Sequence, residues 1–105
     1  MITQDRIDEM ARRIVARFEP QKIILFGSYA GGAPTEESDL DLLIITDSDL
    51  PSRVQSRKVR QLISDLAIPV DVIVKTSNEF ETYKDIVGTI IYPAARFGRV
   101  IYESE

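Results

Sequence analysis

Two short apolar runs constrain the fold of this chain more than any other feature. Residues 22–26 read Lys-Ile-Ile-Leu-Phe, and residues 40–45 read Leu-Asp-Leu-Leu-Ile-Ile. Apolar runs of this length are typical of strands that are covered on both faces. Gly27 ends the first run, and the two glycines, one proline and two glutamates of residues 31–38 predict an exposed loop. We therefore expect two buried strands joined by that loop.

Helical periodicity appears on either side of these strands. Apolar side chains at helical spacing predict an amphipathic helix over residues 3–18, with Thr3 as its N-cap. The same spacing predicts a second helix over residues 51–66, in which Ser52 and Gln55 have the spacing of a capping box. The alternation of strands and helices indicates an α/β fold.

The C-terminal third adds at least one more strand. Residues 70–75 read Val-Asp-Val-Ile-Val-Lys, which predicts a third strand, and residues 100–102 predict a possible fourth. Two short helices are expected between them, one from Thr76 to about Val87 and one that starts at Gly88-Thr89. These side chains are expected to be buried: Phe80, Tyr83, Ile90, Ile91, Ala94, Ala95 and Phe97. We therefore predict a mixed twisted sheet of three to four strands with helices mainly on one face.

The composition excludes several kinds of chemistry. The 105 residues contain no cysteine and no histidine, so thiolate metal sites and histidine bases are excluded. Any catalysis must therefore use carboxylates, hydroxyls and basic side chains. The net charge of −4 argues against direct binding of a nucleic acid backbone.

The apolar segments are short throughout the sequence. None approaches the roughly 18 residues that a membrane span requires, and the N-terminus lacks the apolar core of a signal peptide. We therefore expect a single cytoplasmic domain over residues 1–105, without contact with a membrane.

Asp39 and Asp41 stand at the start of the second strand. Because they are two residues apart, their side chains point to the same face. Neighbouring carboxylates repel each other unless a cation is present. Mg²⁺ suits such a site, since it binds through one or two carboxylates together with substrate phosphates. The plainer interpretation is that the two aspartates form only a polar strand start.

Asp71 lies inside the otherwise apolar third strand, where an unpaired carboxylate would be costly to bury. If this strand lies beside the second, three carboxylates converge and could hold two metal ions and accept a proton. The alternatives are an ion pair with an arginine or exposure at the edge of the sheet.

Gly27-Ser28, directly after the first strand, could place backbone N–H groups and a hydroxyl around a phosphate. Taken alone, this pair is more typical of an ordinary turn. It is not a Walker A loop, because no Gly-Lys-Ser/Thr follows.

Together these motifs resemble the nucleotidyltransferase domain of the DNA polymerase β-like superfamily. Ten residues separate Gly27-Ser28 from Asp39-Leu40-Asp41. The segments GSYAGG…SDLDLLI and VGTIIYPAARFGRVIYE look most like the minimal nucleotidyltransferases (MNT). The resemblance implies that Gly27 and Ser28 hold the nucleotide's terminal phosphates and that Asp39 and Asp41 bind two Mg²⁺ ions. It also implies that Asp71 shares a metal ion and helps to activate the acceptor hydroxyl.

The resemblance also implies a partner. Minimal nucleotidyltransferases commonly pair with a HEPN-domain toxin, and can move AMP from ATP onto a tyrosine of that toxin. An antitoxin enzyme in a homo- or hetero-oligomer is therefore expected, with no nucleic acid bound directly. The alternatives are an antitoxin that neutralises by binding alone and, less favoured, a small-molecule transferase of the aminoglycoside type or an RNA-tailing enzyme.

One position departs from the family pattern. Many relatives have an arginine where this chain has Gly31, and a glycine cannot hold phosphate oxygens as a guanidinium can. Lys22, Arg53 or Lys75 could supply the missing cation. Arg53 belongs to a helical stripe, completed by Arg57 and Arg60, that is either a solvated face or a binding surface for an acidic partner.

Overall fold

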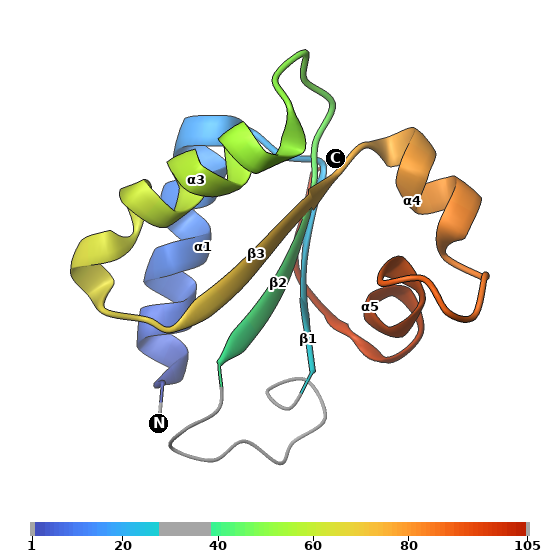
Figure 1. Cartoon of the computed structure of the whole chain (residues 1–105). Coiled ribbons are helices and arrows are strands. Elements are labelled where there is room, and N and C mark those ends of the chain that lie inside the picture. Colours follow the sequence, from blue (N-terminus) through green and yellow to red (C-terminus); the bar gives the residue numbers. More distant parts are fainter. Residues whose placement is uncertain (1, 28–38, 105) are drawn as a thin grey trace.

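The computed structural model describes residues 2–27 and 39–104. Four strands form a single sheet, with helices on either side (Figure 1). In chain order the elements are α1 (Gln4–Phe18), β1 (Lys22–Phe26), β2 (Leu40–Ile45), α3 (Ser52–Leu62), the short 3₁₀ helix η1 (Ser64–Leu66), β3 (Val70–Lys75), α4 (Ser77–Tyr83), α5 (Ile91–Phe97) and β4 (Arg99–Glu103).

The sheet has the order β3-β2-β1-β4 and is mixed, as predicted. β2 pairs with β1 in antiparallel fashion and with β3 in parallel, while β4 pairs antiparallel with the other side of β1. The predicted fourth strand is thereby confirmed. The parallel connection from β2 to β3 passes through α3, so α3 returns toward the edge of the sheet where both strands begin.

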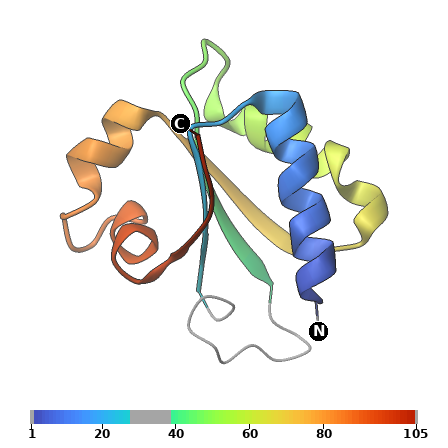
Figure 2. The ribbon, with the colours of Figure 1, turned by 180° about the vertical axis from the view of Figure 1, so that it is seen from behind.

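Helices cover both faces of the sheet, α1 and α3 on one face and α4 and α5 on the other (Figures 1 and 2). Ile23 and Leu25 of β1 pack with α1 and α3, whereas Ile24 and Phe26 pack with α4 and α5. The prediction of helices mainly on one face was wrong in this detail, although the α/β class was right. The continuous apolar runs are the physical reason, because alternate strand residues point to opposite faces and both sets are apolar.

The predicted helix starts have mixed outcomes. The Thr3 hydroxyl accepts a hydrogen bond from the backbone N–H of Arg6 at 3.3 Å, which confirms that N-cap. The predicted capping box of Ser52 was wrong, because Pro51 is the N-cap of α3 and makes no side-chain cap. Gln55 instead donates to the carbonyl of Leu50 at 2.9 Å, across the turn that precedes α3.

Three side chains predicted to be buried are exposed. The exposed fractions are 41% for Tyr83, 51% for Ile90 and 69% for Phe97. α4 ends at Tyr83 and α5 begins only at Ile91, so Tyr83 and Ile90 lie where the chain turns away from the sheet. The helical pattern predicted longer helices, in which these side chains would have faced the sheet.

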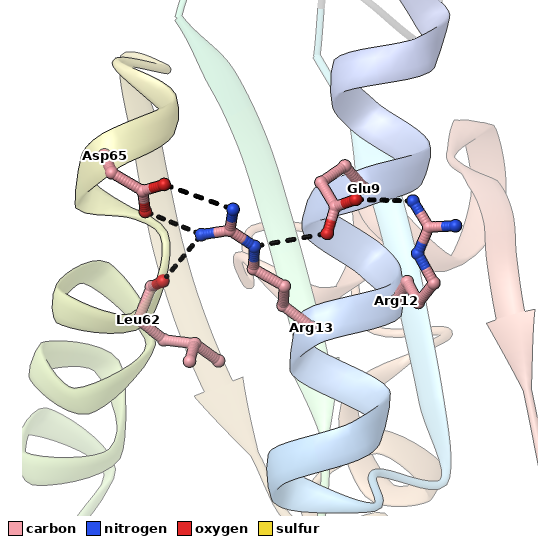
Figure 3. A network of polar contacts seen from close by, with 5 residues as sticks. All are labelled: Glu9, Arg12, Arg13, Leu62 and Asp65. Atoms are coloured by element: carbon pink, nitrogen blue, oxygen red, sulfur yellow. Dashed lines mark hydrogen bonds and ion pairs between the residues drawn. The ribbon is translucent and has the colours of Figure 1, made fainter.

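Arg13 joins α1 to the segment that follows α3 (Figure 3). Its guanidinium donates to both carboxylate oxygens of Asp65, at 2.6 and 3.1 Å, and to the carbonyl of Leu62 at 3.3 Å. Its Nε also donates to Glu9 at 3.2 Å. Among the residues drawn in Figure 3, Arg12 contacts only Glu9, which lies in the same helix; its Nη2 is 2.5 Å from Oε1 of Glu9. The Arg13 network holds the two helices together on one face of the sheet.

This difference predicts unequal effects of two neighbouring substitutions. Arg13→Ala should lower the Tm by several degrees, because it removes a bridge between elements distant in sequence and leaves the Asp65 carboxylate without its guanidinium partner. Arg12→Ala should change the Tm little, since its side chain is 71% exposed and the pair lies within one helix. Thermal unfolding by circular dichroism measures both, and equal shifts would contradict the bridging role.

Asp47 connects the end of β2 to the start of α4. Its carboxylate accepts hydrogen bonds from the Ser77 backbone N–H at 3.0 Å and hydroxyl at 2.8 Å, and from the Gln21 amide at 2.8 Å. These bonds, the Ser77 backbone bond first, hold the pKa of Asp47 below its usual range. The carboxylate therefore contributes to stability only while it is ionised.

The lowered pKa of Asp47 fixes the sign of a pH effect. A carboxyl group with a depressed pKa in the folded state stabilises fully above the unfolded value of about 3.9, and this contribution is lost as pH falls through the folded pKa. Asp47→Asn should therefore lower the Tm at neutral pH, and the difference from the unmodified chain should shrink below about pH 4. Asp49→Asn, at an exposed carboxylate nearby, is the control. A difference that stays constant across this range would contradict the prediction.

Candidate active site

The strand register brings two of the predicted carboxylates together. Asp41 of β2 lies directly beside Asp71 of the parallel strand β3, and Phe26 at the end of β1 is its partner on the other side. Alternate residues of β2 and β3 pack toward α1 and α3, so Asp41 and Asp71 face the side of α4 and α5. The expectation that the third strand lies beside the second is confirmed.

Gly27 fits tightly against one of these carboxylates. Its φ is +77°, a backbone conformation that side chains rarely adopt. A Cβ placed on Gly27 would lie 2.2 Å from Oδ2 of Asp41, closer than any non-bonded contact allows. The positive φ favours glycine, and any Cβ at this position would displace the Asp41 carboxylate from the place it occupies.

A pocket of about 430 Å³ opens at the end of the sheet where β2 and β3 begin. Its described lining combines the two carboxylates with apolar side chains and one basic side chain: Phe26, Gly27, Asp41, Arg60, Asp71, Val72, Ile73, Ile90 and Pro93. Two hollows of about 540 and 590 Å³ lie elsewhere, and among the described residues that line them Asp85 is the one carboxylate. The pocket at the start of β2 and β3 is thus the site where acidic side chains converge.

Three effects raise the pKa of Asp41. Partial burial is the largest, followed by the negative charges of Asp71 and then of Asp39. Asp39 lies one residue before β2 and is exposed, so it acts on Asp41 by its charge and does not line the pocket. A cation between the carboxylates would relieve this repulsion.

Asp71 is exposed on β3, which is an edge strand. Of the alternatives that the sequence left open for Asp71, exposure at the edge of the sheet is the one observed. Asp71 stands at the accessible margin of the pocket and forms no ion pair with any residue of 2–27 or 39–104. Its significance comes from its register with Asp41.

The donor set fits a divalent ion that also binds a substrate. Among residues 2–27 and 39–104, no three acidic side chains are grouped closely enough to hold a metal ion by themselves. Mg²⁺ does not need three, because it binds through one or two carboxylates and completes its shell with water and phosphate oxygens. Asp41 and Asp71 fit that pattern, and Asp39 is close enough to interact with Asp41 electrostatically.

The cations suggested from the sequence lie away from the pocket. Lys22 and Lys75 both pair in register with Ile45, at the end of β2 opposite Asp41, and Arg53 is in the first turn of α3. Lys22 is also engaged with Glu103 at 3.1 Å. Ser28 and Gly31 fall outside the described residues.

Arg60 is the basic side chain that does line the pocket, and sequence reasoning missed it. The sequence placed it on an arginine stripe, without indicating which end of that stripe approaches the carboxylates. The signal was present, because a helix between two parallel strands ends where the second strand begins. The last turn of α3 therefore lies near the start of β3.

The chain belongs to the nucleotidyltransferase domain family, because the model of that family matches residues 7–93. This confirms the resemblance based on the Gly-Ser turn and the aspartates. No helix among the described residues is long and apolar enough to cross a membrane.

Similar proteins point in the same direction. A candidate protein adenylyltransferase of Methanocaldococcus jannaschii, MJ0604, is 37% identical over 82 residues, covering 78% of each chain. The protein adenylyltransferase MntA of Thermococcus cleftensis is 26% identical over 97 residues, which cover 88% of this chain and 97% of MntA. A solved toxin–antitoxin structure with AMP-PNP has the same fold, with a TM-score of 0.64, 20% identity and coverage of 99% of this chain and 76% of that one.

Proposed function

We propose that this chain is an antitoxin that transfers AMP from ATP to a tyrosine hydroxyl of a HEPN-domain toxin. The observation that carries the proposal is the register pair Asp41–Asp71, which lines a pocket beside Gly27. The similarity to proteins named as protein adenylyltransferases supports a protein acceptor. The solved toxin–antitoxin structure of the same fold supports a toxin as that acceptor.

Asp41 and Asp71 would hold Mg²⁺, with Asp39 contributing to a second ion. When bound, Mg²⁺ neutralises the phosphate charge and orients the phosphate chain. Asp71, at the accessible margin of the pocket, accepts the proton of the acceptor hydroxyl. The hydroxyl oxygen then bonds to the α-phosphorus, the bond to the bridging oxygen of the β-phosphate breaks, and pyrophosphate leaves.

The surroundings of the pocket favour a macromolecular acceptor. Ile90, which lines the pocket, is 51% exposed, and Val87 nearby in sequence is 76% exposed. Exposed apolar side chains beside a pocket are typical of a surface that contacts a protein. An acceptor presented by a second chain would cover them.

Neutralisation by binding alone is the second candidate. The same exposed side chains favour it, because they would bury apolar area in a complex whether or not AMP is transferred. Under this alternative, the carboxylates are dispensable for neutralisation.

The deciding experiment uses ATP labelled at the α-phosphate, Mg²⁺, and a HEPN-domain toxin whose gene lies beside the gene for this chain. Label should appear on the toxin with the unmodified chain and be lost with the double variant Asp39→Asn/Asp41→Asn. Mutation of the labelled tyrosine should also remove it. If the double variant binds and neutralises the toxin at equal stoichiometry, binding alone is the function. If the unmodified chain transfers no label to the toxin, the proposed reaction is wrong.

A further inference from the structure

Among the charged side chains in the described lining of the active-site pocket, Arg60 has no role in the proposed reaction. It stands in the last turn of α3, on the face of the sheet opposite α4 and α5. Because β3 is an edge strand, the pocket extends around it, and its lining includes Arg60 together with Asp71. A guanidinium from one face and carboxylates from the other thus border the same space.

Arg60 is not engaged by the protein itself. It is exposed, and within residues 2–27 and 39–104 it has no hydrogen-bonding or ion-pair partner. Arg13, by contrast, is fully engaged by carboxylates and a carbonyl. If the role of Arg60 were to neutralise the pocket, an ion pair with Asp71 would be expected, and none is formed within 4.0 Å. The guanidinium is available to a ligand.

The ligand that suits this arrangement is a phosphate chain. A metal ion held by carboxylates binds some phosphate oxygens, and a guanidinium binds others through two parallel N–H···O bonds. We propose that Arg60 binds the phosphate chain of the nucleotide held at Asp41 and Asp71. This inference rests on the proposed function for the identity of the nucleotide. It makes Arg60 a substrate-binding residue of the site.

The simplest alternative is a structural role. A basic residue in the last turn of a helix interacts favourably with the helix dipole, without any ligand. That role would affect stability and leave nucleotide affinity unchanged. The two roles are therefore separated by measuring binding and unfolding on the same variants.

The test is calorimetric titration of the free chain with ATP in excess Mg²⁺. Arg60→Ala should weaken binding by about 10- to 100-fold, as expected for loss of a charge-assisted contact. Arg60→Lys keeps the positive charge but loses the paired N–H donors of the guanidinium, so its affinity for ATP should lie between those of the unmodified chain and Arg60→Ala. Arg57→Ala removes another exposed arginine one turn earlier, outside the pocket lining, and should bind as the unmodified chain does.

The outcomes separate this inference from the proposed function. Binding by the unmodified chain with unchanged affinity in Arg60→Ala would overturn the role of Arg60 alone. Equal weakening in Arg57→Ala and Arg60→Ala would also overturn it, because a general charge effect would then suffice. Absence of ATP binding by the unmodified chain would overturn both. Selective weakening in Arg60→Ala supports Arg60 even if no label reaches the toxin.

Discussion

Replacing Asp71 with asparagine should reduce AMP transfer by about 10²- to 10⁴-fold, the range expected when a general base is lost. The substitution keeps the size of the side chain and removes the charge that adjoins Asp41 across the parallel register. It should also weaken Mg²⁺-dependent ATP binding, since one of the two paired carboxylates is gone. Initial rates of label transfer and ATP titration with and without Mg²⁺ measure the two effects.

The stability of this variant provides an internal check. Asp71 is exposed and repels Asp41, so its neutralisation should leave the Tm unchanged or slightly higher. Asp49→Asn, another exposed aspartate outside the pocket lining, should alter neither transfer nor binding. Transfer by Asp71→Asn at the rate of Asp49→Asn would show that the site lies elsewhere.

The sequence predicted the carboxylate pair because strands have a simple periodicity. Each of two apolar runs carries an aspartate near its start. If those runs form adjacent strands, Asp41 and Asp71 come to lie near each other. The argument did not require burial of Asp71, and exposure at the edge of the sheet was one of the alternatives it left open. It required only adjacency, which is common for consecutive strands joined by a helical crossover.

The helical parts of the site were harder to predict. Periodicity identifies the buried stripe of α3, but it does not show which exposed residue reaches around an edge strand, and so Arg60 was missed. Likewise, periodicity overestimated the lengths of α4 and α5. It cannot show that a helix ends where the chain no longer packs against the sheet. Tyr83 and Ile90 are exposed for that reason. Both failures concern tertiary contacts that no local pattern contains.

The role of Gly27 was predicted only in part. The Gly-Ser pair indicated a turn for phosphate, whereas the described structure shows that Gly27 makes room for the Asp41 carboxylate. A sequence shows that a glycine follows a strand but not which side chain approaches it. A side chain introduced at Gly27 should therefore act on the site through the Asp41 carboxylate.

Gly27→Ala should reduce Mg²⁺-dependent ATP binding by about 10- to 100-fold, the range expected when a group that orients a metal ligand is changed. The new Cβ would lie 2.2 Å from Oδ2 of Asp41, so the carboxylate must move from its place beside Asp71. The φ of +77° adds a stability cost of about 1–3 kcal/mol.

Gly88→Ala separates the steric effect from the backbone strain. Gly88 also has a positive φ, +98°, but a Cβ there would meet nothing within 4 Å among the described residues. Both variants should therefore unfold at lower denaturant concentration, and only Gly27→Ala should lose ATP affinity. If the two variants bound ATP equally well, the contact between Gly27 and the carboxylate would have no part in shaping the site. Loss of affinity in Gly27→Ala alone would mean that this glycine positions Asp41 for the metal ion.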